Sequence, residues 1–244
     1  MSNLIHIIAV AYKRLPELRV FTQSWINQTN DEWQLTIIHD GESQEFTNLM
    51  NEANYIHPNI EFFCTDQRHN DYGHTLRDLG LKRAEGTYTI LTNADNYFIP
   101  RTSEYISTLI HELNNTPDMP DVILFDMIHS HNNPGIRKQP AYNLFKTEFK
   151  QYSIDVSCAA VRTELAKAAG FRDKTHDGDQ TYFKELTNND IREQMYRESQ
   201  DQLEQDMAPF GFVVNGLEDE NIGEAVDEYG TRWSPIVRNY DSNW

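Results

Sequence analysis

The sequence predicts an α/β fold in which a mostly parallel sheet is covered by helices on both faces of a single domain. Short apolar runs alternate with segments of helical period from residue 4 to about residue 100, and the connections between them are short. Strands and helices in such alternation form parallel sheets covered on both sides. No internal repeat, low-complexity block or linker divides the 244 residues, of which 39% are apolar, so one large domain is favoured over two small ones.

The first half of the chain is expected to supply four strands and three helices. They follow in the order strand 4–11, helix 12–28, strand 33–39, helix 43–56, strand 59–64, helix 74–85 and strand 87–92. The first helix carries Leu18, Phe21 and Trp25 at spacings of three and four, the period of a helix with one apolar face. The last strand mixes β-branched, aromatic and aliphatic residues behind Gly86, which is typical of a short buried strand.

The second half of the chain is also expected to contain both helices and strands. Its predicted elements are helix 101–115, strand 122–128, helix 160–169, a helix opening in GDQTYFKEL, a charged surface helix over 189–207 and a strand over 211–215. Gly170 is expected to end the helix over 160–169, because glycine readily adopts the left-handed conformation that closes helices. An acidic tail rich in polar turns follows residue 215.

Two aspartates follow directly on predicted strands. Asp40 comes after strand 33–39 and precedes Gly41, which permits a tight turn, and Asp95 lies in the polar turn NADN after strand 87–92. Right-handed crossovers bring the carboxyl ends of parallel strands to one edge of the sheet, where such sheets bind ligands. Because Mg²⁺ often bridges carboxylates to substrate phosphates, we interpret Asp95 as the centre of a metal and diphosphate site. The alternative is a polar turn that caps a strand.

The formal charge of the chain is −17 and is spread unevenly. Residues 173–244 hold 17 acidic and 6 basic residues, a net −11. This balance opposes broad electrostatic adhesion to nucleic acid or to an anionic membrane. The segment 134–150 is a local exception, with four basic residues against one glutamate. It is interpreted either as a solvated loop and helix face or as a patch that holds a phosphate-bearing acceptor.

The sequence also bears on the compartment. The N-terminus has no basic region before its short apolar run, which predicts a strand rather than a signal peptide. No window approaches the length of a membrane span. Cys64 and Cys158 lie far apart in apolar stretches, which favours buried free thiols in a reducing compartment. We therefore expect a soluble, cytoplasmic protein.

Four blocks of the sequence resemble, in order, the inverting family 2 glycosyltransferases of the GT-A fold. AYKRLPELRVFTQSWINQTNDEWQLTIIHDGES is similar to the family's strand, helix and second strand ending in Asp-Asp-Gly-Ser. GHTLRDLGLKRAEGTYTILTNADNYFIP is similar to its arginine-bearing helix and the strand that ends in Asp-x-Asp. IDVSCAAVRTELAKAAGF and THDGDQTYFKEL resemble the acceptor-side segment and the acidic motif that opens a helix.

The resemblance covers about residues 4–187 and implies a domain division. The GT-A core would be residues 1–187, with a nucleotide-sugar half over about 1–100 and an acceptor half over about 101–187. Residues 188–244 would form a C-terminal extension packed on that core.

The resemblance also implies the donor site. Asp40 would hydrogen-bond the uracil or ribose of a nucleoside diphosphate, and Arg77 would face the diphosphate. Asp95 would ligate Mn²⁺ or Mg²⁺, with Asn93 in place of the first aspartate of the family's metal motif. The rest of the implied donor site is the backbone that would line the base, Ala9, Val10, Ala11 and Tyr12. Ala94, between the two metal ligands, completes the set.

The implied general base is Asp179 or, as the second candidate, Asp177, which would deprotonate the acceptor hydroxyl as it attacks the anomeric carbon. Asp179 suits the N-cap of the following helix equally well.

The sequence departs from the family pattern in several places. Asn93 lacks the charge of an aspartate, and His39 replaces the first aspartate of Asp-Asp-Gly-Ser. Many relatives supply a late histidine near the metal, whereas the last histidine here is His176. Asn215 and Asp219 are the nearest polar candidates for that position.

The activity implied is metal-assisted transfer of a sugar from a nucleoside-diphosphate sugar, with UDP-sugar preferred, to a surface glycan or lipid-linked sugar. The first alternative is a phage-type transferase that glycosylates hydroxymethylated bases in DNA. A nucleotidyltransferase is a further alternative, although the glycine-rich basic loop expected after the first strand is missing from the sequence. A non-catalytic sugar-nucleotide binder is the last. The sequence does not predict an oligomeric state.

Overall fold

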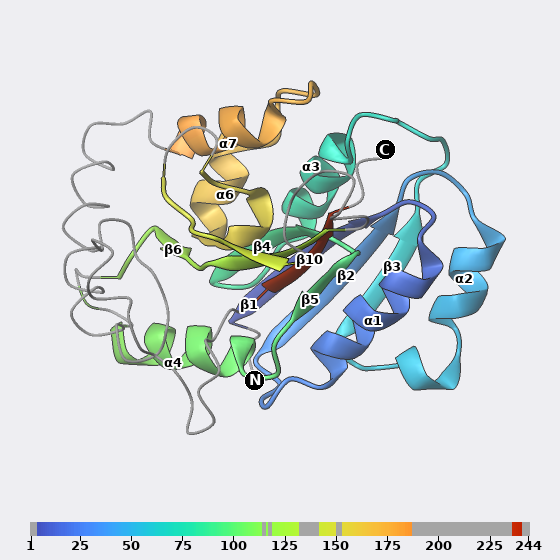
Figure 1. The fold of residues 1–244 in the computed structure, drawn as a ribbon, viewed down its shortest axis with the longest axis horizontal. Helices are drawn as coiled ribbons and strands as arrows, with labels where there is room; N and C mark the ends of the chain where they lie inside the picture. Colours follow the sequence, from blue (N-terminus) through green and yellow to red (C-terminus); the bar gives the residue numbers. More distant parts are fainter. Residues whose placement is uncertain are drawn as a thin grey trace.

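A computed structural model describes residues 4–113, 116, 119–131, 142–149, 153–186 and 236–240 of the chain. Two sheets and the helices around them make up this part of the protein (Figure 1).

The central sheet has six strands in the order β3-β2-β1-β4-β9-β6. Its strands are β1 (Ile5–Ala11), β2 (Trp33–His39), β3 (Ile60–Cys64), β4 (Tyr88–Asn93), β6 (Val122–Leu124) and β9 (Ala159–Arg162). Strands β1 to β4 are mutually parallel, and β9 is antiparallel to both of its neighbours. The predicted mostly parallel sheet of one α/β domain is therefore confirmed.

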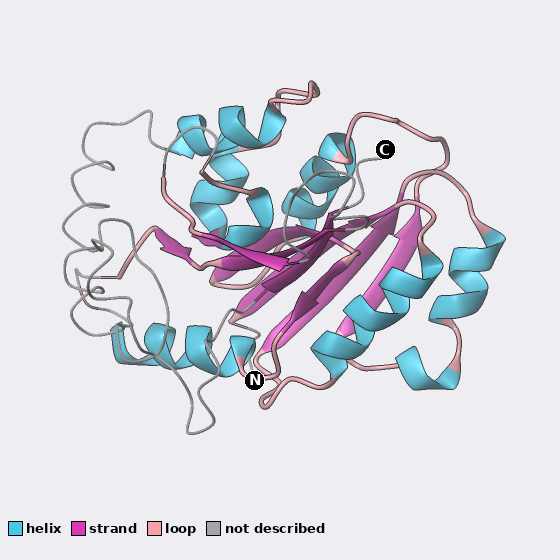
Figure 2. Cartoon of the chain, in the orientation of Figure 1, coloured by secondary structure: helices cyan, strands magenta, loops and turns pink. Residues whose placement is uncertain are grey.

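Helices cover both faces of this sheet (Figure 2). They are α1 (Leu15–Ile26), α2 (Gln44–Met50), α3 (His74–Arg83), α4 (Thr102–Leu113), α6 (Thr163–Ala169) and α7 (Gly178–Leu186), with 3₁₀ turns at Ala53–Tyr55 and Val156–Cys158. In the described part of the chain, no helix has the length and apolar character needed to cross a membrane.

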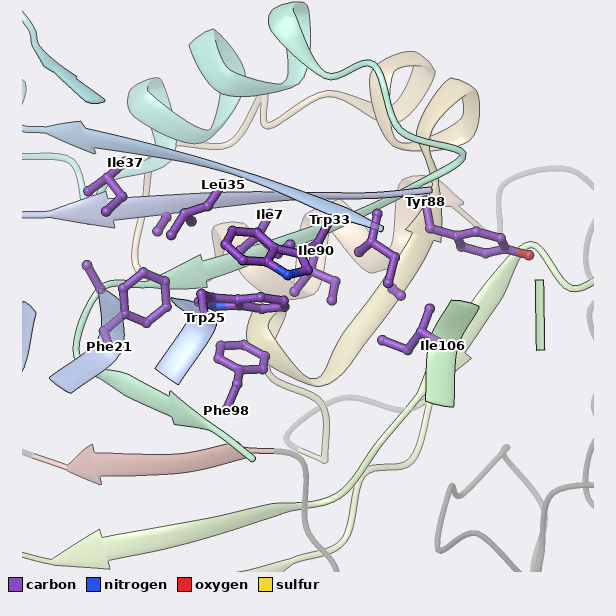
Figure 3. Packing of buried hydrophobic residues seen from close by; sticks show 14 of the residues in the cluster. Ile7, Phe21, Trp25, Trp33, Leu35, Ile37, Tyr88, Ile90, Phe98 and Ile106 are labelled. Atoms are coloured by element: carbon purple, nitrogen blue, oxygen red, sulfur yellow. The ribbon is translucent and has the colours of Figure 1, made fainter. Parts of the chain in front are cut away.

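The alternation of side chains along β1 divides the core in two. Ile5, Ile7 and Ala9 pack with side chains of α1, α2 and α4, whereas Ile8 and Val10 pack with those of α3, α6 and α7. Successive strand residues point to opposite faces, so a strand buried on both faces reads as a continuous apolar run. Figure 3 shows the first cluster, in which the ring of Trp25 lies 5.6 Å from that of Trp33 and 4.8 Å from that of Phe98, centroid to centroid.

A second sheet has the order β5-β10-β7-β8. Its strands are β5 (Asn96–Phe98), β7 (Met127–His131), β8 (Tyr142–Phe145) and β10 (Ile236–Tyr240). β10 lies between β5, to which it is antiparallel, and β7, to which it is parallel. A strand from the end of the chain thus completes a sheet begun immediately after Asp95. The helix predicted over 189–207 and the strand predicted over 211–215 lie outside the described residues.

Three predicted elements differ from the structure. The helix expected over 43–56 ends at Met50, and a separate 3₁₀ turn over Ala53–Tyr55 follows it. The strand expected over 122–128 is divided, because β6 stays in the central sheet while β7 joins the second one. Between them the N–H of Phe125 donates to the Cys158 carbonyl (2.9 Å), and the carboxylate of Asp126 accepts the N–H of Thr147 (2.9 Å). These bonds hold the chain where it changes sheets.

The helix predicted over 160–169 is wrong in its first three residues, which belong to β9. Ala160 pairs with Ile90 on one side and Ile123 on the other, and it is fully buried. Alanine has a high helix propensity, but here the backbone hydrogen bonds of two flanking strands override it. The helix begins at Thr163, whose hydroxyl lies 2.9 Å from that of Thr89 in β4.

Candidate functional site

The strand register brings Asp40 and Asp95 to the same edge of the central sheet. β1 lies between β2 and β4, with Ala11 opposite His39 and Val10 opposite Asn93. Asp40 follows the end of β2 and Asp95 follows the end of β4 by two residues. Since all three strands are parallel, the two carboxylates flank the end of β1.

Asp40 lines a cavity of about 100 Å³. Its carboxylate accepts hydrogen bonds from the backbone N–H groups of His69 (2.7 Å) and Asn70 (3.1 Å). The lining residues are Val10, Ala11, Tyr12, Asp40, Arg68, Asn70, Tyr72, Gly73 and Leu76. The loop before α3 forms one wall, and three of its residues have left-handed backbones: Asn70 (φ 54°), Tyr72 (φ 61°) and Gly73 (φ 80°).

The cavity combines a carboxylate with a flat aromatic surface. The guanidinium of Arg68 lies 3.9 Å from the centroid of the Tyr12 ring, and its Nε lies 3.9 Å from Asp40. Gly73 is needed at the wall, because a Cβ there would lie 2.7 Å from the side chain of Val10. A planar ring that donates an N–H group matches such a site, since the carboxylate accepts and Tyr12 or Arg68 stacks.

A second cavity, of only about 10 Å³, adjoins the first across the end of β1. Its walls are Val10, Ala11, Tyr12, Lys13, Arg14, Leu18, Asn93, Ala94 and Asp95. Val10, Ala11 and Tyr12 line both cavities, whereas Ala9 is buried within β1 and lines neither. One elongated ligand lying over the end of β1 could contact both aspartates.

Asp95 and Asn93 each accept a hydrogen bond from an arginine. The Nη1 atom of Arg14 donates to Asp95 over 2.8 Å, and the Nη2 atom of Arg77 donates to the amide oxygen of Asn93 over 2.6 Å. Within the described residues no three His, Cys, Asp or Glu side chains form a metal-binding group. A carboxylate and an amide oxygen beside one cavity nevertheless match the oxygen ligands preferred by Mg²⁺, and a phosphate would supply further oxygens.

Arg77 is almost fully buried, with 2% of its surface exposed. Besides Asn93 it donates to the Tyr72 carbonyl (2.8 Å), and its Nη1 lies 3.1 Å from Nδ1 of His74. Arg77 lines neither cavity, but it bonds Tyr72 of the first and Asn93 of the second, and so ties the loop before α3 to the end of β4. Its expected role at a diphosphate stays a prediction.

Asp177 and Asp179 lie at the start of α7. Asp177 is 72% exposed, whereas Asp179 is half-buried in the first turn. Asp179 lines neither of the two cavities described above. Thr181 donates its backbone N–H to the Asp177 carbonyl (3.1 Å) and its hydroxyl to Asp173 (2.8 Å), and these bonds set the start of the helix.

The loop that carries these aspartates packs on the start of α3. The Nε2 atom of His74 lies 2.9 Å from the Thr175 carbonyl, and the ring of His176 lies 5.6 Å from that of Tyr72, a residue of the first cavity. A Cβ on Gly178 would lie 2.6 Å from Nε2 of His74, so this approach requires glycine. The structure thus brings the loop before α7 to the rim of the Asp40 cavity.

His74 is neutral in this arrangement. Burial and the neighbouring charge of Arg77 lower its pKa to about 4. Because Nδ1 accepts from Arg77, we assign the proton to Nε2, which donates to Thr175.

Arg14, Arg68 and His74 are site residues that the sequence analysis missed. Arg14 could have been found from its position, because a basic residue directly after a strand lies at the same edge as the aspartates. Arg68 and His74 have no such signal, since a polar loop of irregular backbone brings them to the site. Asn215 and Asp219, the candidates for a late metal ligand, lie outside the described residues.

Known proteins resemble this chain in fold more than in sequence. No curated protein sequence matches the chain. A crystal structure of residues 1–349 of TarS from S. aureus superposes with a TM-score of 0.57 at 16% identity, covering 76% of this chain and 55% of that one. The same TarS fragment in complex with UDP-GlcNAc gives 0.56 at 18% identity, covering 76% and 53%.

The mannosyltransferase PcManGT from Pyrobaculum calidifontis, in complex with GDP-Man and Mn²⁺, gives a TM-score of 0.51 at 10% identity and covers 90% of this chain and 56% of that one. The chain thus spans little more than half the length of these structures, and at such identities the likeness shows the GT-A fold alone. The family model described as glycosyl transferase family 2 matches residues 6–169, about two thirds of the sequence. The chain belongs to glycosyl transferase family 2.

Proposed function

We propose that this protein is an inverting glycosyltransferase that moves a sugar from a nucleoside-diphosphate sugar, preferably a UDP-sugar, to an acceptor hydroxyl. The observation that carries the proposal is the pair of adjoining cavities at the end of β1, one holding Asp40 and the other Asp95. A nucleoside diphosphate carries a planar base at one end and a diphosphate at the other, so its two ends match the two cavities. Family membership supports the reaction class.

The base is assigned to the cavity of Asp40. The carboxylate accepts a base N–H, and Tyr12 stacks on the ring, with Val10 and Ala11 lining the same cavity. The TarS complex with UDP-GlcNAc supports uracil. The PcManGT complex with GDP-Man keeps guanine as the alternative, because guanine also presents N–H groups to a carboxylate.

The diphosphate is assigned to the surface beside Asp95, because the cavity there, at about 10 Å³, is too small to enclose it. Asp95 and Asn93 would hold Mn²⁺ or Mg²⁺ there, and the cation would offset the negative charge that develops on the departing nucleoside diphosphate. The Mn²⁺ in the PcManGT complex supports this assignment. Arg77 donates to the Asn93 amide oxygen and would add positive charge near the diphosphate.

Asp179 is proposed as the general base, and Asp177 as the second candidate. The acceptor oxygen attacks the anomeric carbon as its proton passes to the carboxylate, and the bond to the diphosphate oxygen breaks. Attack from the side opposite the leaving group inverts the anomeric centre. The contact of the loop before α7 with Tyr72 and His74 supports a position of this base next to the donor.

The acceptor proposed is a surface glycan or a lipid-linked sugar. Hydroxymethylated bases in DNA are the alternative, and the net charge of −17 opposes them. Much of the basic segment 134–150 lies outside the described residues. A nucleotidyltransferase and a non-catalytic sugar-nucleotide binder remain as alternatives of other classes.

A panel of UDP-, GDP- and other nucleotide sugars, each with and without Mn²⁺, tests the proposal. A ligand that binds only the native state raises the melting temperature, so the true donor is expected to do so, and more with Mn²⁺. Slow release of nucleoside diphosphate from that donor would support a transferase. Pyrophosphate release from a nucleoside triphosphate would support a nucleotidyltransferase instead, and tight binding without turnover a binder.

A further inference from the structure

Arg14 forms an ion pair with Asp95, the carboxylate proposed above as a ligand of the divalent cation. Its Nη1 atom lies 2.8 Å from Oδ2 of Asp95, a residue 81 positions later in the sequence. The carboxylate is 8% exposed and the arginine side chain 22% exposed, so the pair is largely shielded from water. An ion pair in such a place is screened much less by salt than one on the surface.

The backbone at Arg14 is strained. Lys13 and Arg14 have φ angles of 55° and 49°, the left-handed region that residues other than glycine rarely adopt. Arg14 is also the N-cap residue of α1, yet its side chain makes no capping bond and reaches Asp95 instead. Strained residues of this kind persist where the surrounding structure holds them, and they cluster at ligand sites.

Arg14 and a divalent cation compete for the same carboxylate, because both are positively charged and like charges repel. The cation therefore binds well only once the guanidinium has moved away from Asp95. A diphosphate beside Asp95 offers the guanidinium a new partner, since its planar fork matches phosphate oxygens. Arg14 and Asp95 line the same cavity, so this exchange needs only a small movement of the side chain.

We propose that Arg14 occupies the cation position on Asp95 in the free protein and transfers to the diphosphate when the nucleotide binds, so that nucleotide and divalent cation bind cooperatively. The proposal rests on the function proposed above. It makes Arg14 a positioning residue that couples the binding of nucleotide to the binding of the cation. By linkage, the cation must favour the nucleotide by the same factor.

The test is a binding cycle that needs no turnover. Free Mn²⁺ is measured by electron paramagnetic resonance during titration of the protein, with and without saturating UDP, for the wild type and for Arg14→Gln. The wild type is expected to bind Mn²⁺ weakly alone and at least about tenfold more tightly with UDP. In Arg14→Gln, Mn²⁺ alone binds more tightly, UDP alone binds more weakly, and the enhancement by UDP falls severalfold.

Arg19→Gln is the matched control, because Arg19 lies on the same helix and forms an exposed ion pair with Glu52. It is expected to keep the wild-type enhancement. If Arg14→Gln does not fold, Arg14→Lys replaces it, because lysine keeps the charge but lacks the planar guanidinium. Its affinity for Mn²⁺ alone should stay weak, and the enhancement of that affinity by UDP should fall.

An unchanged enhancement in a folded Arg14 variant would overturn the proposal. So would a wild-type protein whose Mn²⁺ affinity is the same with and without UDP, a result that needs no variant. A wild type that binds neither UDP nor any other nucleoside diphosphate refutes instead the function on which the proposal rests.

Discussion

At the scale of single residues, two carboxylates are candidates for the proposed general base. Asp179 is half-buried in the first turn of α7, whereas Asp177 is 72% exposed and lies 3.4 Å from Nδ1 of the exposed His176. A catalytic base must be held in one place relative to the reacting hydroxyl. The partial burial of Asp179 therefore favours it over Asp177.

Asp179→Asn is expected to lower kcat by about 10²–10⁴-fold, because an amide cannot take the proton. The dissociation constant of the nucleoside diphosphate should stay within about twofold, since Asp179 lines neither cavity. Initial rates and calorimetric titration of the two variants would measure this. Asp177→Asn is the matched control and should keep most of the activity. If Asp177→Asn loses the activity and Asp179→Asn keeps it, the assignment passes to Asp177.

His6 makes the stability of the protein depend on pH. It lies within β1, with Nε2 2.8 Å from the Thr36 hydroxyl and Nδ1 accepting the N–H of Glu85 (3.1 Å). Burial lowers its pKa from 6.5 to about 4. The unfolded chain therefore binds a proton below about pH 6.5 that the folded protein does not bind until about pH 4.

The contribution of His6 to the free energy of unfolding is therefore fully present above pH 6.5. It decreases as the pH falls from 6.5 towards 4. At pH 5 the loss from His6 is on the order of 2 kcal/mol in the free energy of unfolding. Urea denaturation at pH 7 and pH 5 would measure it. His6→Gln keeps hydrogen-bonding groups without the titration, so its unfolding free energy should change less between the two pH values. An equal change in both proteins would show that His6 is not the source.

At the scale of elements, the contact between α3 and the loop before α7 joins the two halves of the proposed site. His74 at the start of α3 meets the Thr175 carbonyl, and the backbone of Gly178 approaches the same ring. A Cβ at Gly178 would also lie 2.7 Å from the Asp173 carbonyl, so neither neighbour is free to give way cheaply.

Gly178→Ala is therefore expected to shift the start of α7 and to lower kcat by about 10–100-fold, because misplacement by about 1 Å can cost that much. Nucleotide affinity should change far less than kcat. Kinetics and the melting temperature together would measure the effect. Lys184→Ala, on the exposed face of the same helix, serves as the control. A Gly178→Ala variant with full kcat would indicate that the contact does not position the base.

At the scale of the whole molecule, the charge of −17 favours the proposed glycan acceptor over DNA. A DNA duplex would have to overcome repulsion by this net negative charge before a local basic segment could act. Transfer of a radiolabelled sugar at about 150 mM salt would test this. We expect labelled product on glycan acceptors and none on hydroxymethylated DNA. Labelled DNA would favour the phage-type alternative.

The sequence predicted most of the first hundred residues closely. The apolar runs that became β1, β2 and β4 are buried on both faces, so their hydrophobicity alone marks them, and parallel strands necessarily bring Asp40 and Asp95 to one edge. Predictions were weaker after residue 100. There, short strands such as β6 and β9 pair with partners far away in the sequence, and that pairing overrode the helix propensity of Ala159 and Ala160.

What the sequence by itself determined is the alternation of strands and helices, the parallel sheet and the two acidic strand ends, because each depends on local periodicity and chain order. Only the tertiary structure decided which charges face those acids. Arg14 reaches Asp95 across 81 residues, Arg77 reaches Asn93 from α3, and β10 enters the second sheet from the far end of the chain. Such contacts depend on how elements pack in three dimensions, and no local pattern in a single sequence encodes them.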